Sequence, residues 1–235
     1  MPIETGLTIG GIHRTSLIDY PDLVATVIFL RGCNFRCPYC FNPELVDPNR
    51  YQAPISKEEV LRFLAKRKGE IDGVVFTGGE PTINFGLCDF ISEIRSLGYR
   101  VKLDTNGSRP DLIEDGLNRG LIDYLAVDLK APLERYNQVC GTMVDTKSIT
   151  KTIKITIASG IDYEFRTTVV PGLITGEDLM EMTRLIKGAK RWAIQNFVAT
   201  KTLDSSYQDR EPFSDDDMIG FRSLIQGSVS EVIVR

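Results

Sequence analysis

The chain has 235 residues, 42% of them hydrophobic and 26% charged, which is typical of a globular protein with a substantial core. Its 28 basic and 32 acidic residues give a net charge of −4, and no dense run of Lys or Arg occurs. This charge balance argues against a broad nucleic-acid-binding surface, so we expect no nucleic-acid partner.

We expect no targeting or membrane-spanning segment. The longest apolar run, residues 23–30, is far too short to cross a bilayer. The first residues, Met-Pro-Ile-Glu, contain no basic stretch followed by an apolar core, so no signal peptide is expected. We therefore expect a cytoplasmic protein with no membrane partner.

Apolar, β-branched segments alternate with segments of helical period, which indicates repeated βα units and a parallel sheet. The expected strands are residues 24–30, 73–77, 100–104, 124–128, 163–169 and 193–199. The expected helices are residues 57–68, 84–97, 110–119, 146–159 and 177–188. Six βα units are fewer than the eight of a closed barrel, so the pattern predicts an α/β fold with a partial, open (β/α)6 TIM-type barrel.

Local signals support these elements. Ser56 with Glu59 three residues later predicts a capping box, and Thr175 marks another helix start. No linker is evident, so we expect a single domain over residues 1–235, with its core at about 22–200. The tail, residues 204–235, is expected to contribute a helix at 215–226 and an extended segment at 231–235, and to cover the barrel edge.

Three cysteines follow the first expected strand with CxxxCxxC spacing: Cys33, Cys37 and Cys40. Their loop would lie at the carboxyl end of the sheet, where barrel enzymes build their active sites. Reduced thiolates crowded into eight residues are suited to ligation rather than to disulfides. Soft sulfur ligands suit an iron–sulfur cluster, and three of them would leave one iron of a cubane open.

A structural zinc site and unligated packing are the alternatives for these thiols. Zinc normally needs four Cys or His ligands, but the sequence has a single histidine, His13. Cys88 falls within an expected helix and Cys140 lies far along the chain. We expect both to be small, buried, apolar side chains.

Polar motifs stand at the ends of three further strands. The second strand ends in Gly78-Gly79-Glu80-Pro81, the third in Asp104-Thr105-Asn106-Gly107 and the fourth in Asp128-Leu129-Lys130. The paired glycines would let the backbone approach a ligand closely. Taken alone, Asn106-Gly107 also reads as a turn and Asp104 as a loop carboxylate. Because strand ends converge on one rim of a barrel, these side chains could together orient a polar cofactor.

The cysteine spacing, with an aromatic residue before the last cysteine, resembles the signature of radical S-adenosylmethionine enzymes. The resemblance implies that Cys33, Cys37 and Cys40 hold a [4Fe-4S] cluster whose open iron binds S-adenosylmethionine. It implies that Tyr39 lies against the adenine, although Tyr39 could also be an ordinary packing aromatic. The motif at 78–81 would contact the amino group of the methionine moiety through Gly78, Gly79 and Glu80.

The motifs at residues 104–107 and 128–130 resemble those of glycyl-radical-enzyme activases. The resemblance implies that they bind S-adenosylmethionine, Asn106 included, and that Lys130 faces its ribose. It also implies a possible monovalent cation, with Asp104, Thr105, Asp128 and the backbone of Ala126 as ligands.

Arg166 matches an arginine on the fifth strand of the same activases. An arginine within an otherwise apolar strand needs a partner. A carboxylate of the cofactor and Glu80 are equal candidates for that partner.

The segments Thr15-Ser16-Leu17-Ile18-Asp19-Tyr20-Pro21-Asp22 and Phe41-Asn42-Pro43-Glu44-Leu45 resemble the activating proteins of anaerobic ribonucleoside-triphosphate reductase. The resemblance covers most of residues 7–200. Phe41 departs from a common histidine and Asp22 from a common glycine. Residues 195–197 lack the histidine of pyruvate formate-lyase activases, which favours the reductase branch. Asp19 would help to place the partner's glycine loop, or would simply form a turn.

The resemblance implies that flavodoxin or ferredoxin reduces the cluster, and that S-adenosylmethionine is cleaved to methionine and a 5′-deoxyadenosyl radical. This radical would remove a hydrogen from a glycine Cα of the partner enzyme. No catalytic residue beyond the cluster and S-adenosylmethionine is expected. The alternatives are a partner of the pyruvate formate-lyase type, a small-molecule substrate, or an electron carrier. An electron carrier should offer four cysteines for each cluster.

Overall fold

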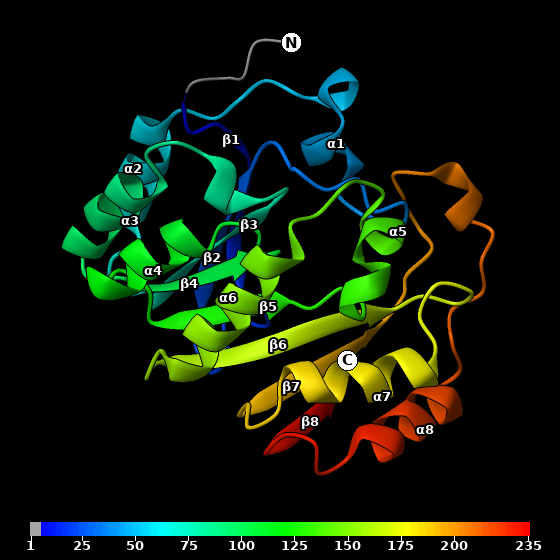
Figure 1. Ribbon diagram of the computed structural model, residues 1–235. Helices are drawn as coiled ribbons and strands as arrows, with labels where there is room; N and C mark the ends of the chain where they lie inside the picture. The colour runs from blue at the N-terminus through cyan, green and yellow to red at the C-terminus, as the bar shows by residue number, and fades with distance from the viewer. Residues whose placement is uncertain (1–5) are drawn as a thin grey trace. The chain divides into compact units, whose positions relative to one another are not determined.

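The protein has an α/β fold built on a mostly parallel sheet, as the sequence predicts. A computed structural model describes residues 6–235, which contain eight strands in the sheet order β1 to β8 (Figure 1). β1 (Ile9–Ser16) is antiparallel to β2 (Ala25–Leu30), whereas β3 (Gly73–Gly78) runs parallel to β2 and to β4 (Arg100–Thr105). β7 (Arg191–Asn196) is parallel to both β6 (Asp162–Val169) and β8 (Glu231–Val234). β5 spans Tyr124–Asp128.

The six expected strands are β2 to β7, and two further strands extend the sheet. β1 was not expected, because its residues do not form a continuous apolar run. β8 is the extended tail segment that the sequence predicts. The expectation that no signal peptide is present rests on residues 1–4, which lie outside the described residues.

The chain forms two compact units. The N-terminal unit comprises the segment ending at Asn34 together with Glu44–Thr105 and Asp111–Leu125. The C-terminal unit comprises Phe35–Pro43, Asn106–Pro110 and Ala126–Arg235. No helix within residues 6–235 is long and apolar enough to cross a membrane.

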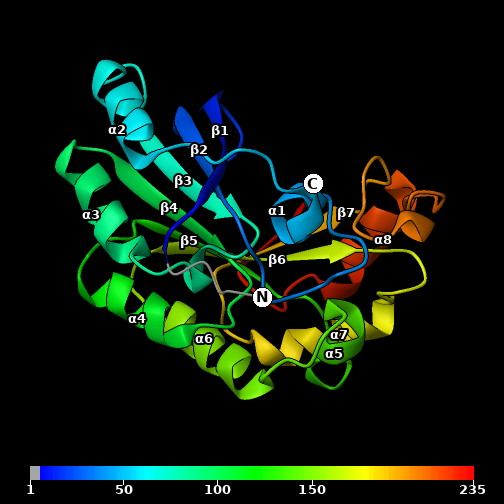
Figure 2. The same ribbon diagram turned by 90° about the horizontal axis from the view of Figure 1, so that it is seen from above.

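The core of the N-terminal unit is formed by aligned apolar residues of its parallel strands. Ile28 of β2 pairs with Phe76 of β3, which pairs with Leu103 of β4, and all three side chains are buried. Helices α2 (Lys57–Lys66) and α3 (Leu87–Ser96) lie along one side of these strands (Figure 2). Phe90 of α3 packs edge-on against Phe76, with 5.8 Å between ring centroids. The fourth helix, α4, spans Pro110–Asn118.

The C-terminal unit has an equivalent core. Phe165 of β6 pairs with Trp192 of β7, which pairs with Val232 of β8. The Trp192 Nε1–H donates to Thr167 Oγ1 at 3.0 Å, so the indole is fixed to β6. Helix α7 (Gly176–Leu185) lies beside α8 (Asp215–Ile225) in Figure 1, and α6 spans Thr146–Ala158.

Helix starts follow the expected caps with small differences. Ser56 Oγ accepts from Glu59 N at 3.1 Å, which is one half of the expected capping box. Thr175 forms a complete capping box with Asp178. The expected helix at 84–97 begins only at Leu87, because a 3₁₀ turn precedes it. The short helices were not expected: α1 (Pro43–Val46), α5 (Tyr136–Cys140) and the 3₁₀ turns Pro48–Arg50, Pro81–Ile83, Leu133–Arg135 and Ser205–Tyr207.

A bidentate ion pair attaches the last residue, Arg235, to β6 within the C-terminal unit. Glu164 of β6 is fully buried, and its two carboxylate oxygens accept from the two terminal nitrogens of Arg235 at 3.0 and 2.7 Å. Two parallel charge-assisted hydrogen bonds give the Arg–carboxylate pair its strength. Removing the cation would leave a buried carboxylate without its charge partner.

We therefore expect Arg235→Ala to lower the free energy of unfolding by about 3 kcal/mol. Urea unfolding at neutral pH measures this change. Arg191→Ala, which removes the partly exposed pair with Glu231, serves as the control and should cost less than about 1 kcal/mol. Equal losses for the two variants would contradict the expectation.

Asp22 lies in the turn before β2 with a φ of +63°, in the left-handed region. Among non-glycine residues, Asp is one of the few that adopt this conformation without severe strain. The glycine that the resemblance leads us to expect here would satisfy the same backbone requirement. The departure at Asp22 is therefore compatible with the same turn.

We expect Asp22→Gly to raise the free energy of unfolding by about 0.5–1 kcal/mol, because glycine relieves the left-handed strain. Asp22→Val should lower it by about 1–2 kcal/mol, since a β-branched residue fits this region poorly. Urea titrations of both variants give the comparison. A loss of stability in both would show that the φ of this residue is not what limits the turn.

Candidate functional site

The ends of β2 and β3 lie side by side in the N-terminal unit. Leu30 pairs with Gly78 in the parallel register, so both strands end at one level. Beyond this pair, Gly79 N donates to Leu30 O at 2.9 Å and Glu80 N donates to Gly32 O at 2.7 Å. The backbone that leads into the cysteine loop is therefore hydrogen-bonded to the motif at residues 78–81.

The two glycines of this motif are required by backbone packing. Gly78 has a φ of +123°, and a Cβ there would lie 2.4 Å from Leu30 O. A Cβ on Gly79 would lie 2.0 Å from Gly32 O. Neither distance is physically possible, so no side chain fits at either position. The sequence interpretation assigned the glycines to a ligand, and the structure adds that they let two segments of the chain approach each other.

Glu80 is buried and binds the end of the next strand. Its Oε1 accepts from Thr82 N at 3.0 Å, from the Thr82 hydroxyl, and from Thr105 Oγ1 at 2.7 Å. The carboxylate thus caps the 3₁₀ turn Pro81–Ile83 and connects it to β4. Asp104, the preceding residue of β4, forms an ion pair with Lys102, which the sequence reading did not single out.

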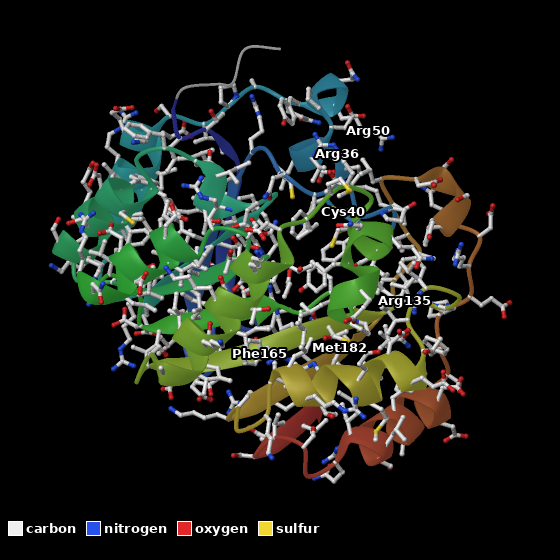
Figure 3. All side chains as sticks on the ribbon, viewed as in Figure 1. Arg36, Cys40, Arg50, Arg135, Phe165 and Met182 are labelled. Atoms are coloured by element: carbon white, nitrogen blue, oxygen red, sulfur yellow. The ribbon has the colours of Figure 1, made fainter. Side chains whose placement is uncertain are left out.

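Cys37 and Cys40 belong to the segment Phe35–Pro43 of the C-terminal unit, and Cys33 lies near the end of the first N-terminal segment. Cys40 N donates to Cys37 O at 3.0 Å, which closes a tight turn between the two cysteines. Arg36 N donates to Cys140 O at 2.8 Å, so this segment is attached to the end of α5 (Figure 3). A Cβ on Gly141 would lie 2.3 Å from Arg36 O, which shows how closely the two backbones approach.

Cys37 is a buried thiol with an acidic character. A hydrogen bond with the Cys140 side chain and the charge of Lys130 outweigh the effect of burial and lower the pKa of Cys37 to about 7. Cys140 is fully buried, as expected, but its contact with Cys37 was not predicted. Cys88 is also buried, and burial and Asp115 raise the pKa of its thiol to about 11, which suits the expected packing role.

The chemistry of these thiols fits an iron–sulfur cluster. All five cysteines lie in residues 6–235, and none of them forms a disulfide. A thiolate is the ligating form, and the lowered pKa of Cys37 favours it near neutral pH. Within the part of the chain that the structure describes, no three His, Cys, Asp or Glu side chains form a ready-made metal site. The assignment of Cys33, Cys37 and Cys40 as ligands therefore stays a prediction from their spacing.

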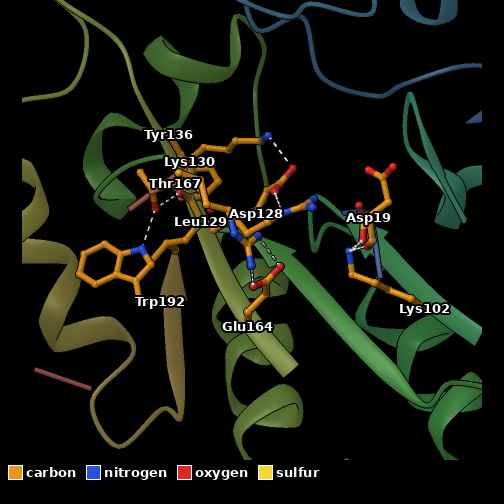
Figure 4. Close-up of polar contacts among 12 residues, drawn as sticks. Asp19, Lys102, Asp128, Leu129, Lys130, Tyr136, Glu164, Thr167 and Trp192 are labelled. Carbon is orange, nitrogen blue, oxygen red and sulfur yellow. Dashed lines mark hydrogen bonds and ion pairs between the residues drawn. The ribbon is translucent and has the colours of Figure 1, made fainter. Parts of the chain in front are cut away.

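Asp128, at the end of β5, is held by two cations (Figure 4). Its Oδ1 accepts from Arg166 Nε and its Oδ2 from Lys130 Nζ, each at 2.9 Å. Although burial alone would raise it, the charges of Arg166 and Lys130 lower the pKa of Asp128 to about 2. Asp128 is thus a partner of Arg166 in the C-terminal unit. From the sequence, only a carboxylate of the cofactor and Glu80 were candidates for this partner.

Tyr39 and Asn106, also in the C-terminal unit, are both buried. Burial and the neighbouring Cys37 raise the pKa of the Tyr39 hydroxyl. Asn106 Oδ1 accepts from Ser108 N at 3.0 Å, and Gly107 has a φ of +76°. These residues form the turn that Asn106-Gly107 predicts, and their contact with S-adenosylmethionine stays a prediction.

We expect Asp128→Asn to be destabilising at pH 6, because it leaves two cations without their carboxylate. The pKa of Asp128 is about 2 in the folded protein and near 4 in the unfolded chain. Its ionised form therefore stabilises the fold at a pH above 4, and this stabilisation is lost as the pH falls through about 2. The contribution amounts to roughly 2 kcal/mol. Urea unfolding at pH 6 and pH 3 should show the gap between wild type and variant narrowing at the lower pH. The exposed Asp209→Asn variant is the control, and an unchanged gap for Asp128→Asn would contradict the expectation.

Comparisons with known proteins agree with these motifs. The chain matches the family model of the Radical SAM superfamily over residues 27–187, which is more than half of its length. A protein of Methanocaldococcus jannaschii, named "Putative glycyl-radical enzyme activating enzyme MJ1227", is 30% identical over 238 residues, 97% of this chain and 95% of that protein. The pyruvate formate-lyase-activating enzyme of Clostridium pasteurianum is 27% identical over 188 residues, 77% of each chain.

A solved structure supports the fold. SuiB of Streptococcus suis, bound to the precursor peptide SuiA, matches with a TM-score of 0.68 at 16% identity, over 89% of this chain and 48% of SuiB. The chain thus spans about half the length of SuiB, and at this identity the likeness concerns the fold alone. The matched superfamily uses a [4Fe-4S] cluster and S-adenosylmethionine, and its model spans the cysteine motif. The chain is therefore an enzyme that belongs to the radical SAM superfamily.

Proposed function

We propose that this enzyme activates a glycyl-radical enzyme by generating a glycyl radical on it. The observation that carries the proposal is the end-to-end similarity to a protein named for that activity. The similarity to a pyruvate formate-lyase-activating enzyme supports the same class. We further propose that the two compact units form one radical SAM domain. We also propose that the enzyme acts in the cytoplasm, where cysteines remain reduced.

The cluster, when bound through Cys33, Cys37 and Cys40, supplies the electron for reductive cleavage of S-adenosylmethionine. The chain itself supplies placement. The glycines at 78 and 79 fix the backbone before the cysteine loop, and Glu80 holds the motif to β4 through Thr105. In this proposal the glycine motif contacts the methionine moiety.

In the C-terminal unit, Tyr39 contacts the adenine and Lys130 the ribose. Asp128 restrains the ammonium of Lys130 and the guanidinium of Arg166, so both cations are fixed before a ligand arrives. The monovalent cation stays a prediction. Asp104 and Asp128 already have cationic partners within the chain, so we do not include this ion in the proposed function.

We propose anaerobic ribonucleoside-triphosphate reductase as the partner and flavodoxin or ferredoxin as the electron donor. The support is the N-terminal segment, residues 15–22, and the lack of a histidine at residues 195–197. Asp19 lies in a closed turn, in which the Ser16 hydroxyl donates to Asp19 Oδ2 at 2.5 Å. In this proposal the turn faces the partner's glycine loop.

The test combines anaerobically reconstituted enzyme, dithionite, S-adenosylmethionine and an anaerobic ribonucleoside-triphosphate reductase. We expect an electron paramagnetic resonance doublet from a glycyl radical, together with 5′-deoxyadenosine. Both signals should vanish when S-adenosylmethionine is left out, and in the Cys40→Ala variant.

The same assay with pyruvate formate-lyase as substrate separates the two kinds of partner. A doublet on pyruvate formate-lyase alone would overturn the reductase assignment and keep the activase class. Formation of 5′-deoxyadenosine without a doublet on either enzyme would refute the activase proposal and favour a small-molecule substrate. The absence of both products from the wild type would point to an electron carrier.

A further inference from the structure

A buried lysine joins two motifs of the N-terminal unit. Lys102 lies on β4, two residues before Asp104, so both side chains project from the same face of the strand. The Lys102 side chain is only 4% exposed and that of Asp104 10%. An ammonium at this depth requires charged or polar partners, because an unpaired buried charge is very unfavourable.

The ammonium has a partner in three directions. Lys102 Nζ lies 2.9 Å from Asp104 Oδ1 and donates to the backbone oxygen of Asp19 at 2.7 Å. It also lies 5.7 Å from the centroid of the Tyr124 ring, within cation–π range. Figure 4 shows the Lys102 side chain reaching Asp19. The lysine therefore connects the end of β4 to the turn between β1 and β2.

This turn has an internal clamp of its own. The Ser16 hydroxyl accepts from Ile18 N at 3.2 Å and from Asp19 N at 3.1 Å, and donates to the Asp19 carboxylate. The Ser16 contacts fix the shape of the turn, but they do not attach it to the sheet. The Lys102 contact is made to the backbone of the turn, so it is independent of the Asp19 side chain.

Two large apolar side chains stand at the tip of the turn. Leu17 is 75% exposed and Ile18 is 89% exposed, although Ser16 fixes the shape of the turn around them and Lys102 binds its backbone at Asp19. Tyr20 lies two residues after Ile18, and its ring packs against Tyr124 at 5.9 Å between centroids and over Gly73. The turn is therefore fixed by hydrogen bonds to its backbone and exposes an apolar tip, Leu17 and Ile18.

We propose that Lys102 is a positioning residue that ties the turn at residues 16–22 to Asp104 at the end of β4. Its ammonium sets the place of the Asp19 backbone, and with it the place of the Leu17–Ile18 tip. That the held turn receives the partner's glycine loop rests on the proposed function. The tie itself does not, because it lies within one compact unit of the chain.

Hydrogen exchange of the full chain, measured by mass spectrometry without partner or S-adenosylmethionine, tests the tie directly. Lys102→Met should raise the exchange rates of the Ile18 and Asp19 amides about tenfold, because the turn opens more often once it is detached. Lys66→Met, at an exposed position of α2, is the matched control and should leave these rates unchanged. Ser16→Ala is the positive control, since it removes the acceptor of both amides.

Folding of the variants is checked by circular dichroism and by exchange in β6 and β7. Lys102→Arg keeps the charge and should restore at least part of the protection, which keeps the test decisive if Lys102→Met unfolds. Rates within twofold of wild type in a folded Lys102→Met protein would overturn the proposal. So would equal effects of Lys102→Arg and Lys102→Met.

A kinetic measurement tests the positioning of the partner. With the anaerobic reductase as substrate, Lys102→Met should raise the KM for the reductase at least fivefold and lower kcat less. A fall in kcat with an unchanged KM would refute positioning. If wild type gives no glycyl radical, the proposed function fails, whereas the exchange experiment still decides whether Lys102 holds the turn.

Discussion

The arrangement of the N-terminal unit depends on the close approach of two backbone segments, residues 30–32 and 78–80. Their hydrogen bonds, Gly79 N to Leu30 O and Glu80 N to Gly32 O, continue the parallel β2–β3 register past the ends of the strands. The approach is possible only because neither residue 78 nor residue 79 has a Cβ. It fixes the backbone on which the cysteine loop begins. It also places Glu80 where its carboxylate can accept from Thr105 at the end of β4. One backbone contact thus orders three strand ends.

Buried charges in both units are balanced by partners from the same unit. In the N-terminal unit Lys102 balances Asp104, and in the C-terminal unit Lys130 and Arg166 balance Asp128. Such pairs add little net stability against an apolar alternative, but breaking one is costly. Their benefit is therefore geometric, because a carboxylate held by two cations, as Asp128 is, has one orientation. A site that must hold a polar cofactor without rearranging gains from groups that are already fixed.

Much of the fold could be predicted from the sequence, because the parallel strands are continuous apolar runs bounded by turn residues. β1 escaped prediction since its residues do not form such a run, and α5 is too short to show a helical period. The candidate residues could be named from motifs, but their contacts could not. The pairing of Lys102 with Asp104 requires knowledge that position 102 faces inward, and its neighbours give little indication of this. The hydrogen bond between Cys37 and Cys140 joins residues about a hundred positions apart, so no local pattern reveals it.

The resemblance to the reductase-activating proteins has two departures, at positions 22 and 41, and they have different physical meanings. At position 22 the requirement is a left-handed φ, which Asp can satisfy in place of glycine. The glycine that the resemblance leads us to expect at this position is therefore explained by the turn and needs no explanation from partner recognition. Phe41 does not have a left-handed φ, and its side chain is 59% exposed. A change from a polar histidine to an exposed apolar ring alters the surface chemistry directly. Under the proposed function, Phe41 is thus the departure that bears on the partner. An exposed side chain contacts whatever binds at the surface, whereas the residue type in a turn is set first by its own backbone φ.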